Sequence, residues 1–186
     1  MKRLLDISIS SILFLLLILP CLIICLLIIL DSKGPIFYKT KRVGQNKKIF
    51  QMYKFRTMAV DAPTINSNDL KDASKYITKI GRGLRKFSLD EIPQIFNILK
   101  GDMSLVGPRP GLESQRDLIE KRDLYKIHDV RPGLTGLAQI NGRDNLNINK
   151  KVEYDKFYKD NQSIILDLKI LVQTLFVVLK SKDIKH

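Results

Sequence analysis

The sequence predicts an α+β protein in two parts: an N-terminal membrane helix over residues 1–31, and a small, helix-rich domain with short strands over residues 32–186. Three observations predict this organisation. Residues 7–30 contain no charged side chain, two short β-favouring runs follow them, and apolar positions then repeat at helical spacing between Pro- and Gly-containing turns. Because the strands are few and short, we expect helices to form most of the domain, some of them at the membrane interface.

Composition limits the partners that the chain can have. Its 186 residues fit one domain with a modest core. The formal net charge of +13 favours an anionic partner, which can be a nucleic acid, an anionic lipid or a phosphorylated substrate. Cys21 and Cys25 both lie in the apolar segment, where they are most simply small buried hydrophobic residues. No disulfide framework is predicted, which suits a reducing compartment.

The apolar N-terminal segment is long enough to cross a bilayer, and basic residues flank it on both sides. Lys2 and Arg3 precede it, and many cations but no acid lie between Ser32 and Val60. The positive-inside rule therefore favours the cytoplasm for both ends. A helix that enters the membrane and turns back at Pro20 satisfies this rule, whereas the alternative is an ordinary single span with a tolerated proline. The residues alone leave both topologies open.

A basic platform follows the apolar segment. Residues 36–41 and 48–57 predict a pair of strands, because β-favouring residues alternate there between Gly-containing turns. Cations next to a membrane bind anionic headgroups, at about 1 kcal/mol for each cation near the surface. Lys54 and Arg56 have a second interpretation, in which they face a substrate phosphate. Gly81-Arg82-Gly83 is weak evidence for phosphate binding, and the absence of Gly-Lys-Ser/Thr excludes a P-loop enzyme.

An adjacent pair of carboxylates, Asp90 and Glu91, stands at the start of a short apolar helix pattern. Ser88 and Glu91 match a capping box, in which the serine caps the helix and the glutamate reaches back to it. Pro93 fits better if the helix begins at Asp90, since proline is tolerated in the first turn. Both alternatives place the two acids at the N-terminal end of a helix that Gly101 ends.

This placement has chemical consequences. The positive end of a helix dipole keeps a carboxylate ionised and attracts phosphate. An ionised Asp90 beside a phosphate and a divalent cation can attack phosphorus, while Glu91 handles a proton or helps to hold the metal. Unless the pair only caps the helix, two adjacent acids in so basic a chain indicate a phosphoryl-transfer site neutralised by Mg²⁺.

Three arginines stand beside Pro- or Gly-containing turns, namely Arg109 in Gly107-Pro108-Arg109-Pro110, Arg131 before Pro132, and Arg143 after Asn141-Gly142. Prolines fix the backbone on both sides of Arg109, so its guanidinium can grip a phosphate with little entropy left to lose. The alternative is a rigid surface turn with a solvated arginine.

The C-terminal half completes the predicted elements. Residues 112–126 carry a charged pattern typical of a surface helix, and residues 138–140 predict a short strand. Ile164–Lys180 is a mostly apolar helix pattern without a clean amphipathic stripe. We interpret it as a helix that lies on the membrane or packs beside the first segment.

These motifs resemble the monotopic polyprenyl-phosphate phosphoglycosyl transferases, the small form of the bacterial sugar transferase family. The resemblance covers nearly the whole chain, and motifs this long in this order are highly specific. They are Lys2-Arg3 with Asp6, Gly34-Pro35-Ile36-Phe37, Lys54-Phe55-Arg56-Thr57-Met58, Arg85, Ser88-Leu89-Asp90-Glu91, Gly101-Asp102-Met103-Ser104, Val106-Gly107-Pro108-Arg109-Pro110, Arg131-Pro132-Gly133-Leu134-Thr135-Gly136 and Asn141-Gly142-Arg143.

The resemblance implies a protein at the cytoplasmic face of the bacterial inner membrane, with a re-entrant helix hairpin that bends at Pro20 and a cytosolic domain. It implies transfer of a sugar 1-phosphate from a UDP-sugar to undecaprenyl phosphate with release of UMP. This reaction is the first membrane step of surface-glycan or glycoprotein-glycan synthesis. The expected partners are these two substrates, membrane lipids and downstream glycosyltransferases, and nucleic acid is not among them.

The resemblance also implies roles for individual residues. Asp90 attacks the sugar-linked phosphate to give a covalent phosphosugar intermediate, Glu91 assists attack by the lipid phosphate, and both hold Mg²⁺. The residues expected to hold phosphates or the nucleotide, with Arg109 near the uridine, are Lys54, Arg56, Arg85, Pro108, Arg109, Pro110, Arg131 and Arg143.

The chain departs from the family pattern at positions that bear on how it sits in the membrane. Leu137 and Ile148 stand where members often carry tryptophan, and Leu19 replaces a serine that often precedes the proline of the bend. None of these positions touches the acid pair.

A function of another class also explains the charge and the tether. It is a non-catalytic, membrane-tethered basic module that binds anionic lipid or nucleic acid. It does not explain the acid pair or the arginines at rigid turns, and few aromatic residues are placed to stack on bases.

Overall fold

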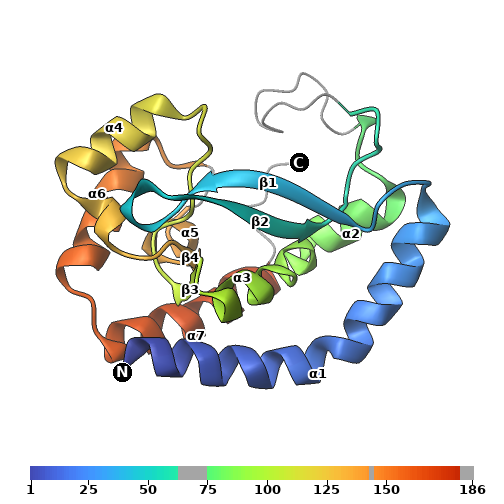
Figure 1. Cartoon of the computed structure of the whole chain (residues 1–186), viewed down its shortest axis with the longest axis horizontal. Helices are drawn as coiled ribbons and strands as arrows, with labels where there is room; N and C mark the ends of the chain where they lie inside the picture. The colour runs from blue at the N-terminus through green and yellow to red at the C-terminus, as the bar shows by residue number, and fades with distance from the viewer. Residues whose placement is uncertain (63–74, 143–144, 181–186) are drawn as a thin grey trace.

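The computed structural model describes residues 1–62, 75–142 and 145–180, and it shows a long N-terminal helix beneath a mixed α/β domain (Figure 1). Two two-stranded sheets lie within the domain. Its helices are α2 (Lys79–Lys86), α3 (Gln94–Lys100), α4 (Arg116–Leu124), α5 (Leu137–Ile140), α6 (Ile148–Asp160) and α7 (Ile164–Lys180). The mixed helix and strand content confirms the α+β prediction.

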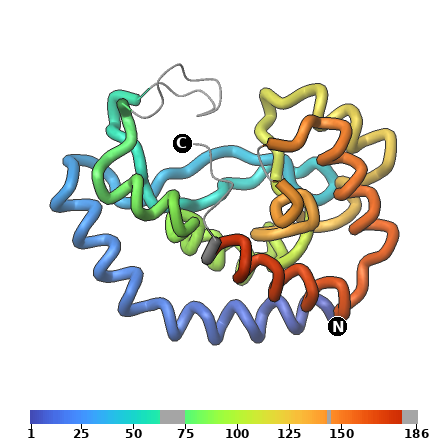
Figure 2. Tube along the Cα trace, turned by 180° about the vertical axis from the view of Figure 1, so that it is seen from behind, coloured from blue at the N-terminus to red at the C-terminus, as the bar shows by residue number. Residues whose placement is uncertain are grey.

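Helix α1 (Lys2–Asp31) runs along the base of the domain and bends partway along its length (Figures 1 and 2). Pro20 lies inside it and lacks the amide that would continue the hydrogen-bond ladder, which accounts for a bend. Among the described residues, α1 is the one helix long and apolar enough to cross a membrane. It is a single continuous helix there, whereas the family resemblance implied a hairpin.

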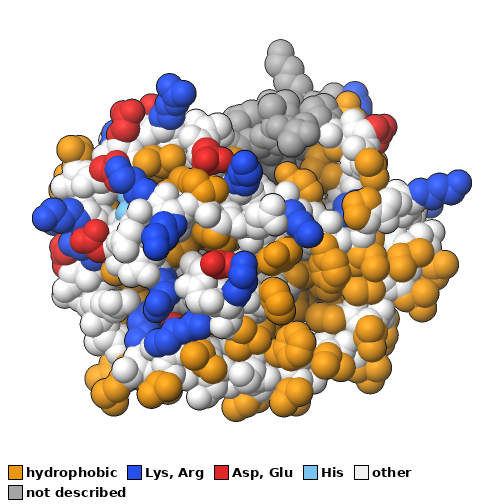
Figure 3. Space-filling model, in the orientation of Figure 1, with side chains coloured by type: hydrophobic (Ala, Val, Ile, Leu, Met, Phe, Trp, Pro, Cys, Tyr) orange, Lys and Arg blue, Asp and Glu red, His pale blue; other side chains and the backbone are white. Residues whose placement is uncertain are grey.

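Most apolar side chains of α1 are exposed, and they gather on the lower and right-hand surface in the orientation of Figure 1 (Figure 3). Both ends of the helix are nevertheless bonded to the domain. Near its start, the Arg3 guanidinium donates to the carbonyl oxygens of Ile98 and Leu99 at 2.6 and 2.9 Å. At its end, the Asp31 carboxylate accepts from the Ile80 amide at 3.0 Å. The helix is therefore anchored to one domain at both termini.

The first sheet is the predicted hairpin. Strands β1 (Phe37–Val43) and β2 (Ile49–Phe55) pair antiparallel through the short 3₁₀ turn Gln45–Lys47. The outer edge of β2 is covered by Asn97 of α3, which accepts from the Tyr53 amide at 3.0 Å and donates to a β2 carbonyl at 2.7 Å. The hairpin therefore carries its cations on a strand that α3 holds in place.

The second sheet was not predicted. Strands β3 (Ser104–Val106) and β4 (Gly133–Thr135) are parallel and three residues each. The strand predicted at residues 138–140 is wrong, because these residues form α5. The strand in this part of the chain is β4, which pairs with β3 and ends at Thr135. After it, the amide of Gln139 donates to the Gly136 carbonyl at 3.0 Å in a helical turn. β3 lies in the largest apolar cluster, which it shares with side chains of β2, α3, α6 and α7.

Helix α2 places its two glycines in different surroundings. Thr78 caps the helix by accepting from the Gly81 amide at 3.0 Å. A Cβ atom on Gly81 would overlap the backbone of Thr57, whereas one on Gly83 would meet no atom within 4 Å. Gly81 therefore permits close packing of α2 on the chain after β2, and Gly83 has no such role.

Alanine at these two positions should have opposite effects. Gly81→Ala should lower the free energy of unfolding by about 2–3 kcal/mol, because backbone atoms must move to admit the methyl group. Gly83→Ala should raise it by about 0.5–1 kcal/mol through reduced chain entropy in the unfolded state. Denaturant unfolding of the two variants in the same detergent measures both values, and an equal effect of the two substitutions would contradict the packing.

Candidate active site

The acid pair lies in a 3₁₀ turn, Leu89–Glu91, directly before α3. Neither of the two expected helix starts is observed. Helix α3 begins at Gln94 and not at Asp90, the Ser88 side chain makes no capping hydrogen bond, and the Ser88 backbone is left-handed, with φ of 54°. This conformation is uncommon for a residue with a side chain, and it marks the turn from α2 into the acid pair. Pro93 stands at the N-cap of α3, where its missing amide costs nothing.

Asp90 and Glu91 are buried, at 8% and 7% exposed, and cations from distant segments compensate their charges. Lys54 of β2 lies 3.3 Å from a carboxylate oxygen of Asp90 and 2.8 Å from Glu91 Oε1. Arg109, in the turn after β3, lies 2.8 Å from the same Glu91 oxygen. Buried carboxylates without such partners would be costly. The structure thus brings together four of the residues that the sequence indicated, Asp90, Glu91, Lys54 and Arg109.

Arg85 and Arg42 extend this cluster. Arg85 donates its Nε–H to the Thr57 hydroxyl at 2.9 Å, and burial lowers the pKa of its guanidinium while the charge of Asp90 opposes the shift. Burial and the neighbouring Arg109 lower the pKa of Arg42 to about 10, against the opposing effect of Glu91. Arg42 was not among the predicted site residues.

The backbone around Arg109 is fixed on both sides. The Pro108 carbonyl accepts from the Gly133 amide at 2.9 Å, and the Pro110 carbonyl accepts from Arg42 Nη1 at 3.3 Å. Pro108 and Pro110, predicted as binding residues, therefore contribute backbone rigidity and two carbonyl acceptors. Side chains at Gly107, Gly133 or Gly136 would overlap one another's backbones, so the strand pair that carries Arg109 packs closely only with glycine there.

A buried ion pair holds the carbonyl of Arg109 itself. Arg122 of α4 donates Nη1–H to this carbonyl at 2.9 Å, and its Nε and Nη2 both contact Asp155 of α6, at 3.0 and 2.6 Å. Their side chains are 5% and 2% exposed. Burial raises the pKa of Asp155, although the charge of Arg122 acts to lower it. No sequence pattern indicated this pair, because the two residues lie on charged helices that resemble solvated surface.

Two further predicted binding residues, Arg56 and Arg131, donate to backbone carbonyl oxygens. Arg56 donates to the carbonyl oxygens of Ser32 and Lys33 at 2.6 and 2.7 Å, and so closes the C-terminal end of α1. Arg131 donates to the carbonyl of Gly101 at 3.1 Å, at the end of α3 opposite the acids. A seven-residue helix separates that end from the acids by about 10 Å. Arg143 lies outside the described residues.

The acid pair was also predicted to hold Mg²⁺. Mg²⁺ sites are usually built from one or two carboxylates together with substrate phosphates and water. Two hard oxygen donors on adjacent residues fit such a shared site. Within the described parts of the chain, no group of three His, Cys, Asp or Glu side chains is placed to hold an ion without a substrate. The donor set therefore fits a metal that arrives with a phosphorylated ligand.

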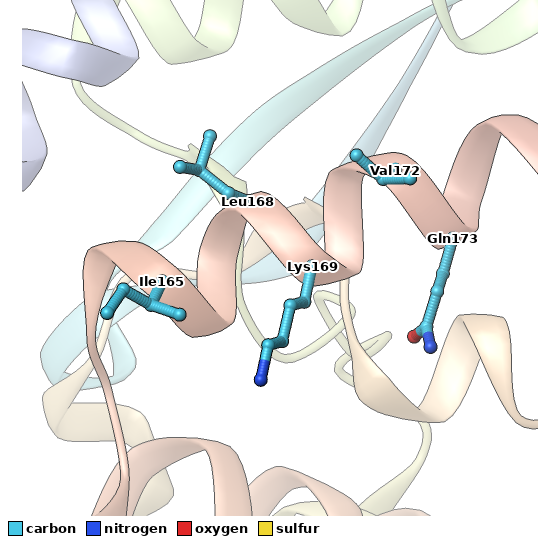
Figure 4. Close-up of a pocket in the computed structure, with 5 residues that line it drawn as sticks. All are labelled: Ile165, Leu168, Lys169, Val172 and Gln173. Carbon is cyan, nitrogen blue, oxygen red and sulfur yellow. The ribbon is translucent and has the colours of Figure 1, made fainter.

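The acids adjoin apolar surface. Phe87, Leu89 and Phe96, which flank them in the chain, are 45%, 37% and 55% exposed. A separate shallow depression lies along α7, lined by Ile165, Leu168, Lys169, Val172 and Gln173 (Figure 4). Lys169 and Gln173 point to one side of the helix there, and Leu168 and Val172 point to the other. This depression shares no lining residue with the acid cluster.

Comparison with known proteins gives consistent matches. The model of the bacterial sugar transferase family matches residues 1–181. EpsL, an uncharacterized sugar transferase of Bacillus subtilis, is 44% identical over all of this chain and 91% of its own length. The UDP-glucose:undecaprenyl-phosphate glucose-1-phosphate transferase of Klebsiella pneumoniae is 43% identical over 94% of this chain and 39% of that protein. The undecaprenyl-phosphate galactose phosphotransferase of Salmonella typhimurium is 37% identical over 97% and 40%.

The buried Arg122–Asp155 pair allows a test of the support behind Arg109. Asp155→Asn leaves the Arg122 charge buried without a counter-ion, so it should lower the free energy of unfolding by about 3–5 kcal/mol. The double variant Arg122→Met/Asp155→Leu should recover most of this loss, since no unpaired charge remains. Glu153→Gln, which breaks an exposed ion pair with Lys150 on the same helix, should leave stability almost unchanged. Chemical denaturation distinguishes these outcomes, and a single variant no worse than Glu153→Gln would contradict the argument.

Proposed function

The chain belongs to the bacterial sugar transferase family, and from this premise we propose that it transfers a sugar 1-phosphate from a UDP-sugar to undecaprenyl phosphate, releasing UMP. Relatives that are named as undecaprenyl-phosphate sugar phosphotransferases support the reaction class. This chain spans about two fifths of those longer relatives, so the activity of the whole relative comes to it only as a proposal. The single observation that carries the proposal is the buried Asp90–Glu91 pair surrounded by cations from separate elements.

In the first step, a carboxylate oxygen of Asp90 attacks the sugar-linked phosphorus. A phosphorus–oxygen bond forms to Asp90, the bond to the bridging oxygen breaks, and UMP leaves with the electron pair. Lys54 contacts Asp90, and Arg85 is close enough for the charge of Asp90 to oppose the lowering of its pKa by burial. These two cations would stabilise the transferred phosphoryl group. The product of this step is an aspartyl phosphosugar.

In the second step, the phosphate of the lipid acceptor attacks the same phosphorus and releases Asp90. Glu91 follows Asp90 in the chain and contacts Lys54 and Arg109, and we assign it the task of assisting the incoming phosphate. Asp90 and Glu91 would also hold Mg²⁺ together with phosphate oxygens of the donor, and the ion would supply charge neutralisation at the diphosphate. The exposed Phe87, Leu89 and Phe96 would keep the acids at the depth where a lipid phosphate lies.

We further propose that α1 is re-entrant and that both of its ends lie at the cytoplasmic face of the bacterial inner membrane. A straight helix of 30 residues is about 45 Å long and would place its ends on opposite sides of a bilayer core of about 30 Å. The anchors of Arg3 at one end and Asp31 at the other reach the same domain, and Pro20 supplies the bend. Downstream glycosyltransferases would then meet the lipid-linked product on that side.

Replacement of the nucleophile gives the direct test of chemistry. Asp90→Asn should lower UMP release from a UDP-sugar by at least about a thousandfold, because an amide cannot form the phosphoryl ester. Binding to liposomes should be unchanged, since α1 and α7 are untouched. Asp117→Asn, an exposed carboxylate on α4, is the matched control and should turn over as the parent does.

Intact-protein mass spectrometry of reactions quenched without lipid acceptor should show a sugar-phosphate adduct, and peptide mapping of the same sample should place it on the peptide that contains Asp90. An Asp90→Asn variant that releases UMP like the parent, or a parent that never carries the adduct, would rule out the covalent mechanism. Retained liposome binding without any UMP release by the parent, across a panel of UDP-sugars, would favour the non-catalytic membrane module instead.

Cysteine labelling tests the topology. In a background with Cys21→Ala and Cys25→Ala, single cysteines are placed directly after Met1, at Lys33 and at Glu120 on α4. A re-entrant α1 should leave all three unlabelled by an impermeant maleimide in intact spheroplasts and labelled in inverted vesicles. Glu120→Cys reports the side of the domain. Labelling of the Met1 site in spheroplasts, with the other two protected, would show a transmembrane span.

A further inference from the structure

The cations around the acid pair follow one another in a fixed order. Burial lowers the pKa of Arg85, and the charge of Asp90 opposes this shift. Lys54 contacts both Asp90 and Glu91, and Arg109 contacts Glu91. Arg42 comes last, since its guanidinium contacts the carbonyl of Pro110, the residue after Arg109. The cluster therefore has an Asp90 end and an Arg109–Arg42 end.

Arg42 is held at its end by backbone pairing. The Val43 amide donates to the Gly111 carbonyl at 3.0 Å, so the end of β1 lies against the turn that carries Arg109. Arg42 shares a face of the hairpin with Lys54, because Lys54 pairs with Tyr38 and side chains alternate along the strand. Four residues of strand separate Tyr38 from Arg42, about 13 Å, so the two cations serve different parts of a ligand.

One like charge acts on Arg42, and the nearby acid is shared with other cations. It lies near the like-charged Arg109, and Glu91, its acidic neighbour in the cluster, is also bonded to Lys54 and Arg109. The Nε of Arg42 is buried and has no hydrogen-bond partner in the part of the chain that the structure describes. Two guanidiniums held together at a cost in repulsion form a site that an anion would stabilise.

We propose that Arg42 and Arg109 together hold the phosphate of the leaving nucleoside monophosphate. This inference rests on the proposed function and deepens it. In an in-line displacement the attacking and leaving oxygens lie on opposite sides of the phosphorus. With Asp90 as the attacking group, the leaving phosphate lies toward the Arg109–Arg42 end of the cluster.

The charge balance of the step fits this assignment. When the bond to the bridging oxygen breaks, its electron pair stays on the nucleoside monophosphate, which gains negative charge at that oxygen. The two guanidiniums would neutralise this charge as it develops, and no proton needs to be transferred, because a phosphate monoester near pH 7 is stable as a dianion. Arg42 would thus be a substrate-contacting residue that lowers the barrier to UMP departure.

Binding of UMP and of uridine to the full chain in detergent, measured by calorimetry, tests the assignment. Arg42→Gln should weaken UMP binding by about ten- to a hundredfold and leave uridine binding unchanged, since the lost contact is to phosphate. Arg42→Lys keeps the charge but loses the planar fork, so it should fall between the two and fold in any case. Lys41→Gln, an exposed neighbour whose side chain lies on the other face of β1, is the control and should bind UMP as the parent does.

The possible outcomes separate the inference from the proposed function. If Arg42→Gln binds UMP as tightly as the parent does, and the parent releases UMP from a UDP-sugar, then only the role of Arg42 is overturned and the proposed function stands. Equal weakening of UMP and uridine also overturns this role of Arg42, because the phosphate would not be what the guanidinium holds. A parent that neither binds nor releases UMP refutes both. If Arg42→Gln does not fold, the UMP-to-uridine comparison in Arg42→Lys decides in the same way.

Discussion

The burial of two adjacent carboxylates is the constraint on which the rest of the site depends. Carboxylates at such low exposure are costly to bury without cations beside them, and Lys54 and Arg109, which contact Asp90 and Glu91, come from a hairpin and a turn far apart in the chain. The Val43–Gly111 bridge and the cover of β2 by Asn97 bring these segments together. The acids therefore reach their final environment only after the long-range packing is complete.

The membrane helix is coupled to the same elements. Arg3 bonds the last carbonyls of α3, the helix that begins just after the acids. Asp6, buried in α1, accepts from the hydroxyl of Ser104 at 3.0 Å and from the Leu105 amide at 3.1 Å, in the strand that leads to Arg109. Lys2 pairs with Asp167 of α7 at 2.6 Å, and Figure 2 shows α7 beside the start of α1. The depth of α1 in a membrane thus fixes the depth of the acids and of Arg109.

Local signals in the sequence predicted what local physics determines. Alternation and turn residues predicted the β1–β2 hairpin, Gly101 ends α3 as expected, and a long, mostly apolar run predicted α7. The strands β3 and β4 were missed because three residues are too few for a period to show. Arg42 was missed because the predicted first strand ended at residue 41, and the pairing register that puts Arg42 on the face of Lys54 is known only from the fold. Arg122 carried no signal, because its partner lies 33 residues away on another helix.

The two cations that bind Glu91 differ in how firmly they are held, and this difference has a chemical use. Arg109 is fixed through the carbonyls of its own turn and through Arg122, so it presents a preorganised charge that needs no reorganisation during the reaction. Lys54 extends a flexible four-carbon stem from β2 and bridges both acids. In the proposed reaction, an incoming phosphate would draw this ammonium away from the carboxylates and free their oxygens for attack or for a metal, while Arg109 would stay in place. Under the proposed mechanism, a fixed guanidinium beside a movable ammonium would keep the two acids paired with cations until a donor arrives.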